Sequence, residues 1–189
     1  MSKLSASHSG SLLPLDLWSR LDQAAAQLPA RWAGWLSTRE MLTDRISREA
    51  GERSTVHLLE EHIGFLSAEQ QALLAAPADS SFLRRIEVRA GGRPWLYAET
   101  LIPDHVLEAH PWLAELSDRA LPEVLAWRDD VAHGPIEVAT LLAAHPLAAR
   151  ALERVGRRDE AVWARRSWVA IGGLRLLIQE AFLPEPKRR

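Results

Sequence analysis

The sequence predicts a single α+β domain built on an antiparallel β-sheet, with helices covering one face. Three observations carry this prediction. The 189 residues (21.1 kDa) are enough for one domain with its own core. Two segments follow the pattern strand, Gly-Gly, strand, which is typical of a tight β-hairpin. Apolar residues at helical spacing precede and separate these segments, so hairpins and helices share one layered domain.

The first third of the chain is expected to be mainly helical. Apolar residues recur every three or four positions over residues 15–28, and a short helix is expected around residues 32–35. The next helix is expected to start at a capping box formed by Ser37 and Glu40 and to end at Gly51.

Strand patterns then dominate. Residues 55–65 alternate as one long strand, and Ser67 is expected to cap a short helix that ends near Leu74. The expected hairpins pair residues 82–90 with 93–103 and residues 162–171 with 174–183.

The segment between the hairpins, residues 104–158, is expected to be helical and interrupted by prolines. We expect residues 14–186 to form the domain. Residues 1–13 are expected to form a flexible N-terminal arm, and residues 187–189 a basic tail.

Composition excludes several classes of function. The chain has no cysteine, so disulfides, thiol catalysis and iron–sulfur clusters are excluded. A net charge of -2 gives no general attraction to nucleic acid. The seven histidines lack metal-binding spacing, and the glycine pairs lack the context of a phosphate-binding loop. No apolar stretch reaches the roughly 18 residues of a membrane span. We expect a cytoplasmic protein with no metal, nucleic-acid partner or membrane span.

Alternation along the predicted strands places two charged residues on apolar faces. Arg84 shares a face with Phe82, Ile86 and Val88, and Glu180 shares one with aliphatic and aromatic residues. A charge against hydrocarbon costs several kcal/mol unless it is paired. Each of the two residues therefore needs a partner.

Two interpretations remain open at this point. Arg84 and Glu180 could form a structural ion pair with each other, or bind backbone groups. Alternatively, both line an enclosed pocket between sheet and helices, where the arginine binds a ligand carboxylate and the glutamate binds a ligand hydroxyl. Alternation also separates Arg165 from Arg166, and we expect Arg165 to face such a pocket.

Several segments of the chain carry motifs that occur together in one known family. They are Trp35-Leu36, Leu42-Thr43-Asp44-Arg45, Phe82-Leu83-Arg84-Arg85-Ile86, Gly92-Arg93-Pro94-Trp95-Leu96, Thr100-Leu101-Ile102-Pro103, Trp163-Ala164-Arg165-Arg166-Ser167 and Gln179-Glu180-Ala181-Phe182-Leu183-Pro184. Together they resemble the bacterial chorismate lyases of ubiquinone biosynthesis. The likeness covers the chain from about residue 30 to its end, and the two hairpins together carry most of it. The chain departs from the family between residues 125 and 161, where residues 136–152 are read as additional helix.

The resemblance implies an enzyme without a cofactor that converts chorismate to 4-hydroxybenzoate and pyruvate. It implies a monomer whose sheet and helical flaps enclose the product. By the same resemblance, Arg84 binds the ring carboxylate and Glu180 lies near the 4-oxygen, and both are catalytic. Leu121 contacts the ligand and Leu42 closes the pocket. Arg165 is the candidate for the pyruvyl carboxylate of chorismate.

The alternative function is a domain that senses a small aromatic acid without converting it. Similar domains occur in bacterial transcription regulators, where they follow a DNA-binding helix-turn-helix. The roughly 30 residues ahead of the matched region are too few for that motif, which favours the lyase. For the lyase, we expect Glu180 to donate a hydrogen bond or proton to the departing ether oxygen. A sensor would keep Arg84 as an anchor and need no such acid at Glu180.

Overall fold

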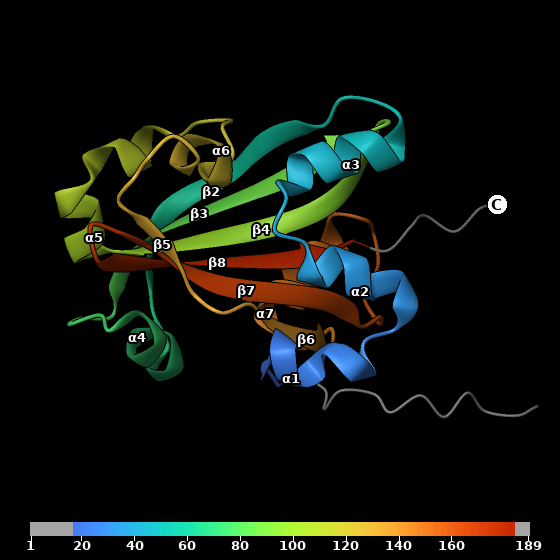
Figure 1. The fold of residues 1–189 in the computed structure, drawn as a ribbon, viewed down its shortest axis with the longest axis horizontal. Coiled ribbons are helices and arrows are strands. Elements are labelled where there is room, and N and C mark those ends of the chain that lie inside the picture. Colours follow the sequence, from blue (N-terminus) through green and yellow to red (C-terminus); the bar gives the residue numbers. More distant parts are fainter. Residues whose placement is uncertain (1–16, 184–189) are drawn as a thin grey trace, which may run out of the picture.

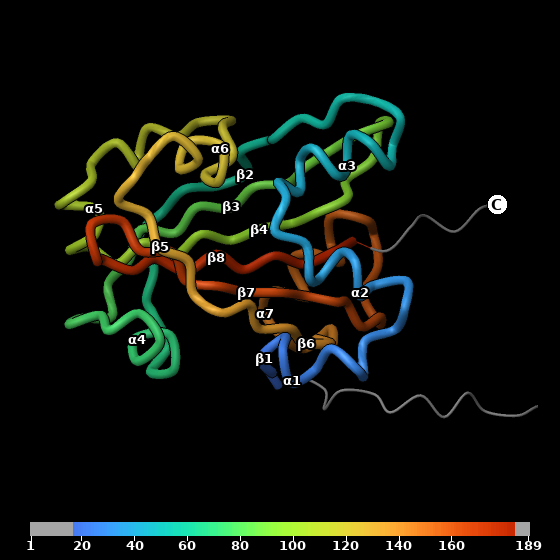
Figure 2. The backbone as a smooth tube through the Cα atoms, viewed as in Figure 1, coloured from blue at the N-terminus to red at the C-terminus, as the bar shows by residue number. Residues whose placement is uncertain are grey.

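An antiparallel sheet organises the described part of the chain, residues 17–183 of a computed structural model (Figure 1). The predicted arm 1–13 and basic tail 187–189 lie outside the described residues. The strands are β1 Ser19–Arg20, β2 Thr55–Phe65, β3 Ser80–Ala90, β4 Arg93–Pro103, β5 Val131–His133, β6 Glu137–Leu141, β7 Val162–Ile171 and β8 Leu174–Phe182. Their order in the sheet is β1-β6-β7-β8-β4-β3-β2, and β5 pairs with β7. Figure 2 shows β2 at one edge and β1 with β6 at the other.

The two predicted hairpins are confirmed as β3–β4 and β7–β8. Both residues of each turn, Gly91-Gly92 and Gly172-Gly173, have positive φ. Two positive φ values in a row match the tight turn that twists with its strands, and glycine adopts them without a Cβ clash. Pairing of β4 with β8 places the two hairpins side by side in the sheet.

Helices cover both faces of the sheet. They are α1 Leu21–Ala24, η1 Ala25–Gln27, α2 Ala30–Ser37, α3 Leu42–Ala50, α4 Ala68–Leu74, α5 Asp104–Ala109, η2 Pro111–Glu115, α6 Leu121–Leu125 and α7 Pro146–Glu153. The front face, defined by Ile86, Ala98 and Glu180, is covered by α2, α3, α5, η2 and α6. The back face, defined by Tyr97 and Gln179, is covered by α4 and α7, a second layer that the sequence does not predict.

The N-terminal helices differ from the prediction. The expected helix over 15–28 begins instead as β1, because Ser19 and Arg20 pair with β6, and only short turns of helix follow. The predicted capping box is wrong. The Ser37 hydroxyl donates to the Ala33 carbonyl at 2.6 Å and so is used within α2, and α3 begins at Leu42 without a side-chain cap.

The middle segment is less helical than expected. Residues 136–152 contain β6 before α7, and residues 131–133 form β5. Short apolar runs fit a strand or a buried helix equally well, and pairing with β7 decides between them here. Gly134 joins the two strands beside the indole of Trp168, where a Cβ would lie 2.4 Å from a ring atom.

Charged groups on the back face are paired. Glu87 accepts hydrogen bonds from Arg89 at 2.8 Å and from Arg154 at 2.9 Å. Burial alone would raise the pKa of Glu87, but these two hydrogen bonds outweigh it and the pKa lies below its usual value.

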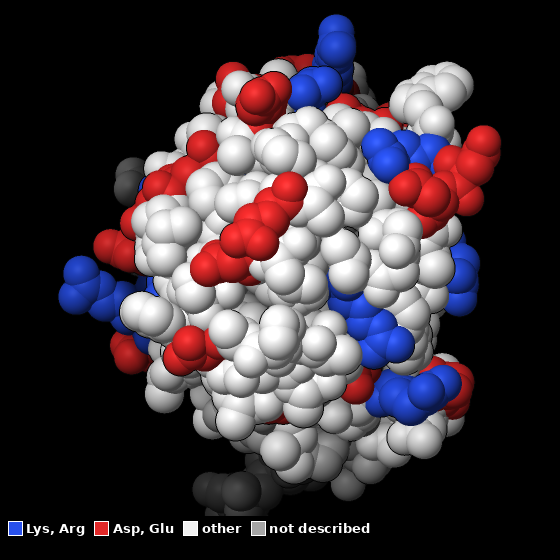
Figure 3. Space-filling view, turned by 90° about the vertical axis from the view of Figure 1, so that its left-hand side faces the viewer, with Lys and Arg blue, Asp and Glu red and all other residues white. Residues whose placement is uncertain are grey.

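The outer surface shows no concentration of one charge at the end of the molecule that carries α5. There, acidic and basic side chains are dispersed among uncharged ones (Figure 3). Across residues 17–183, the helices are too short or too polar to cross a lipid bilayer.

Candidate active site

A cavity of about 430 Å³ lies between the front face of the sheet and the segments above it. Side chains of β3, β4, β8 and β7 form its floor. Residues 38–43, helix α6 and residues 131–136 cover it. The five residues singled out from the sequence all line this one cavity: Leu42, Arg84, Leu121, Arg165 and Glu180.

Arg84 is buried on the cavity floor, with 1% of its surface exposed. Its Nη2 donates to the carbonyl oxygens of Ser117 and Arg119, the latter at 3.0 Å. Ser117 has a φ of 48°, in the left-handed region that costs a non-glycine residue about 1–2 kcal/mol. The guanidinium therefore helps to hold the turn that precedes α6.

A carboxylate accompanies the Arg84 guanidinium. Glu61 Oε1 lies 3.5 Å from Arg84 Nε, and neither atom has a hydrogen-bond partner among the described residues. A register shift between Leu58 and Glu60 places Glu61, and not Glu60, opposite Arg84. Burial lowers the pKa of Arg84, while the charges of Glu61 and Asp118 oppose that shift. An arginine keeps its proton even so.

Arg165 and Glu180 face each other across β7 and β8. Arg165 Nε donates to Glu180 Oε2 at 2.5 Å, and Arg165 Nη1 donates to the carbonyl oxygen of Thr38 at 2.8 Å. Only 12% and 14% of the two side chains are exposed. The guanidinium of Arg166 binds two glutamates elsewhere. Arg165 is therefore the arginine of this pair whose guanidinium belongs to the cavity.

Arg84 and Glu180 do not pair with each other. Each has a different ionic partner, so an ion pair between them is not observed. Arg84 does bind backbone carbonyls, which the structural interpretation also included. Two polar groups remain available in the cavity. No described residue forms a hydrogen bond with Arg84 Nη1 or with Arg165 Nη2. The site thus offers two cationic N–H donors, one on Arg84 beside Glu61 and one on Arg165 beside Glu180.

The apolar covers of the cavity meet above its floor. Leu42 begins α3 and Leu121 begins α6, and both side chains are buried in the lining. The Thr43 hydroxyl donates to Glu123 Oε1 at 3.1 Å, which joins the two helices directly. Closing the cavity in this way would exclude water and strengthen every polar contact inside.

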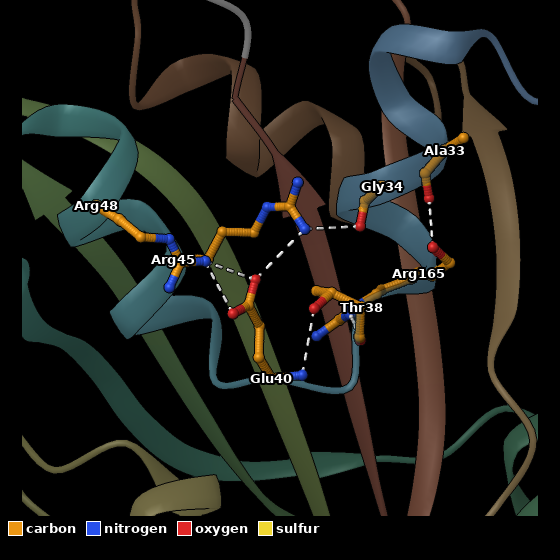
Figure 4. Close-up of polar contacts among 8 residues, drawn as sticks. Ala33, Gly34, Thr38, Glu40, Arg45, Arg48 and Arg165 are labelled. Carbon is orange, nitrogen blue, oxygen red and sulfur yellow. Dashed lines mark hydrogen bonds and ion pairs between the residues drawn. The ribbon is translucent and has the colours of Figure 1, made fainter.

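The connection between α2 and α3 is tied down by an acidic residue, Glu40 (Figure 4). Glu40 accepts from Arg48 at 2.8 Å and from Arg45 at 3.4 Å, and its backbone N–H donates to Thr38 Oγ1. Arg45 also donates to the Gly34 carbonyl at 2.9 Å. The hydrogen bond from Arg48 lowers the pKa of Glu40. The segment that covers Arg165 is thus held by its own ion pairs.

Three contributors to the site carry no signal in the sequence. The Thr38 and Ser117 groups that meet the two arginines are backbone carbonyls, which any residue supplies. Glu61 reaches the site only through the β2 bulge, which strict alternation does not reveal. Among residues 17–183, no group of histidine and acidic side chains is arranged to hold a metal ion.

Solved structures share this architecture at low sequence identity. The C-terminal domain of a histidine utilization repressor from Pseudomonas syringae superposes with a TM-score of 0.57 at 12% identity, covering 72% of this chain and 98% of that one. The ligand-binding domain of a GntR-family transcriptional regulator from Bordetella bronchiseptica gives 0.53 at 13% identity, covering 70% and 86%. These likenesses establish the fold and nothing further.

Other proteins are more similar to this chain in sequence than these solved structures are. A protein named probable chorismate pyruvate-lyase from Halorhodospira halophila is 35% identical over 152 residues, 79% of this chain and 80% of that one. The protein of that name from Pseudomonas aeruginosa is 33% identical over 170 residues, covering 89% and 91%. A chorismate pyruvate-lyase from Erwinia tasmaniensis is 30% identical over 167 residues, covering 87% and 84%. Residues 12–187 also match the family model described as chorismate lyase. The chain therefore belongs to the chorismate lyase family.

Proposed function

We propose that this protein converts chorismate to 4-hydroxybenzoate and pyruvate. The relatives that carry this activity in their names cover most of the chain, and the cavity matches the chemistry of the substrate. Chorismate has one carboxylate on its ring and a second on its enolpyruvyl group. A site for it needs two cationic groups that face one enclosed space.

The two partly unpaired guanidiniums are the observation that carries this proposal. Arg84 and Arg165 stand on β3 and β7, which are separated by β4 and β8. Three strand spacings, together with an offset of two residues along the strands, put their backbones about 16 Å apart. Both side chains enter the cavity from there, and each keeps one terminal nitrogen without a partner among the described residues. In our proposal, Arg84 binds the ring carboxylate and Arg165 binds the pyruvyl carboxylate.

The reaction needs little covalent chemistry from the protein. The C3–O ether bond breaks and its electron pair leaves with enolpyruvate, while C4 loses its hydrogen as a proton and the ring becomes aromatic. Enolpyruvate takes up a proton at its methylene carbon to give pyruvate. Because aromatisation drives these steps, the protein contributes mainly binding, orientation and exclusion of water.

Glu180 is assigned to the C4 hydroxyl. Its Oε2 already accepts from Arg165 Nε, so we assign its other oxygen, Oε1, to accept a hydrogen bond from that hydroxyl. Holding the C4 hydroxyl would fix the ring orientation in which the C4 hydrogen and the C3 ether leave together. Leu42 and Leu121 would pack on the ring faces or edges.

Arg84 would bind the ring carboxylate through Nη1 first. A two-pronged hydrogen bond would also need Nη2, which now donates to the Ser117 and Arg119 carbonyls. Such binding therefore requires those carbonyls to release it. As the resemblance implies, we place the reaction at the first committed step of ubiquinone biosynthesis, in a cytoplasmic monomer without a cofactor.

Incubation of the purified protein with chorismate tests the proposal. Formation of 4-hydroxybenzoate and pyruvate in equal amounts, well above the uncatalysed rate, is expected. Tight binding of 4-hydroxybenzoate without any turnover of chorismate would instead favour a ligand sensor. As a control, Arg84→Ala should lose turnover while Arg93→Ala, on the same hairpin outside the cavity, keeps it.

A further inference from the structure

A second cavity of about 480 Å³ lies on the back face of the sheet. Residues of β3, β4 and β8 line it together with parts of α4 and α7. The sheet itself separates it from the front cavity. Two consecutive residues of β8 line different cavities: Glu180 lines the front cavity and Gln179 lines the second one. The reaction proposed above uses none of the side chains of this second cavity.

A polar row crosses the back face on six neighbouring strands. Ion pairs join the first three members, one on each of β2, β3 and β4, and another joins the last two, on β7 and β6. The member on β8, between these two groups, has no charge. In strand order the row is Glu60, Arg85, Glu99, Gln179, Arg166 and Glu137.

Gln179 interrupts the row and leaves its amide unused. Only 5% of Gln179 is exposed, and its side chain has no hydrogen bond to any described residue. Its neighbour Glu99 is also 5% exposed. Glu99 Oε1 accepts from Arg85, Arg150 and Tyr97, whereas no described donor reaches Glu99 Oε2. Neither group is among the fully buried atoms that lack a partner in the described part of the chain, so both open into the cavity, where an occupant can reach them.

The chemistry of the lining restricts that occupant. Arg85, Arg150 and Arg166 are all ion-paired, and the carboxylates paired with them outnumber the three guanidiniums, which disfavours an anion. These carboxylates are Glu60, Glu69, Glu99 and Glu137. At the middle of the row, one acceptor, Glu99 Oε2, lies beside one amide that both donates and accepts. A hydroxyl group can donate to the carboxylate and accept from the amide. Leu83, Leu101 and Leu147 supply an apolar part of the wall.

We propose that the back-face cavity is a second binding site, for a small neutral molecule that carries a hydroxyl group on an apolar body. The hydroxyl donates to Glu99 Oε2 and accepts from the Gln179 amide, and the apolar body lies against the leucines. This site differs in charge from the front cavity. It does not depend on the function proposed for that cavity.

Benzyl alcohol and toluene form a matched pair of probes, because they share an apolar ring and differ in the hydroxyl. Each is titrated into the full chain while NMR follows the Gln179 side-chain amide, assigned by its loss in Gln179→Leu. We expect saturable shifts with benzyl alcohol and about tenfold weaker binding of toluene, since toluene leaves both polar groups unpaired. Equal affinity for the two probes, or no shift at millimolar benzyl alcohol, overturns the proposal.

Variants and competition locate the bound probe. Gln179→Leu and Glu99→Gln should each weaken the binding of benzyl alcohol. The control variant Gln23→Leu makes the same glutamine-to-leucine change at an exposed position of α1 and should leave binding unchanged. Saturating 4-hydroxybenzoate should leave the Gln179 shifts in place. If it abolishes them, the probe occupies the front cavity and the back-face site is refuted. Absence of chorismate turnover would refute only the front-cavity function.

Discussion

Replacing Glu180 by glutamine tests the polar centre of the front cavity. The substitution keeps the shape of the side chain and removes its charge. In the native protein, Glu180 Oε2 accepts from Arg165 Nε at 2.5 Å, and little of either side chain is exposed. The amide introduced by Glu180→Gln keeps one acceptor oxygen and replaces the other with an N–H donor, so Arg165 and a substrate hydroxyl must share one uncharged oxygen.

The structure sets the size of the expected effect. Charge centres about 4 Å apart interact by about 4 kcal/mol at an effective dielectric of 20, and desolvation cancels much of this. The net loss should resemble that of one hydrogen bond to a charged group, about 1.5–3 kcal/mol. We therefore expect kcat/KM of Glu180→Gln to fall about 10- to 150-fold.

Pyruvate release from chorismate, coupled to lactate dehydrogenase, measures this loss. Arg165→Met and the double variant complete a double-mutant cycle. Because the two groups form one pair, the double variant should be no worse than the poorer single variant, with a coupling of about 1–3 kcal/mol. Wild-type kcat/KM in Glu180→Gln, or losses that simply add, would refute the role given to this pair.

Three further predictions concern stability and release. In Gly134→Ala, the new Cβ would lie 2.4 Å from an atom of the Trp168 indole. Such overpacking costs roughly 1–3 kcal/mol, and each kcal/mol lowers Tm by about 2–4 °C in a chain of this length. An unchanged Tm in a thermal scan would contradict the close approach of Gly134 to Trp168. Glu40→Gln removes the ion pair with Arg48 that helps to hold residues 38–43 over the cavity. The dissociation rate of 4-hydroxybenzoate, measured by stopped-flow dilution, should therefore rise about twofold to fivefold. An unchanged rate would show that Glu40 does not help to keep the cavity closed. The pKa of Glu87 is lowered in the folded state, so its charged form stabilises the fold at pH values above the unfolded pKa near 4.3, and this stabilisation is lost as the pH falls below that value. The free energy of unfolding, measured with urea from pH 3 to 7, should therefore fall less steeply toward low pH in Glu87→Gln than in the native protein. The same pH dependence in both proteins would count against the stabilising ion pairs of Glu87.

The floor of the front cavity could be predicted from the sequence because the strands there are regular. Two-glycine turns fix the register of both hairpins, and alternation then assigns a face to every residue. Arg84 lies on β3, Arg165 on β7 and Glu180 on β8. Alternation holds on these strands, and the three side chains line one cavity. The family resemblance selected Leu42 and Leu121, which periodicity alone would not distinguish from other core leucines.

The rest of the site depends on tertiary contacts. The β2 bulge exchanges the places of Glu60 and Glu61, so the strand pattern assigns the partner of Arg84 to the wrong face. The carbonyls of Ser117 and Thr38 meet the arginines because loops far apart in the sequence converge above the sheet. Short strands β5 and β6 take their conformation from pairing with β7, which local propensity does not encode.

Both cavities depend on the register of the β7–β8 hairpin. Each strand sends consecutive residues to opposite faces, so Arg165 and Glu180 pair at the front while Arg166 and Gln179 lie opposite each other at the back. A slip of one residue in either strand would reverse the faces of all its side chains and exchange the polar groups of the two cavities. The positive φ angles of Gly172-Gly173 define the tight turn that prevents such a slip. These turn glycines, which touch no ligand in our proposals, are therefore as necessary to the site as its charged residues.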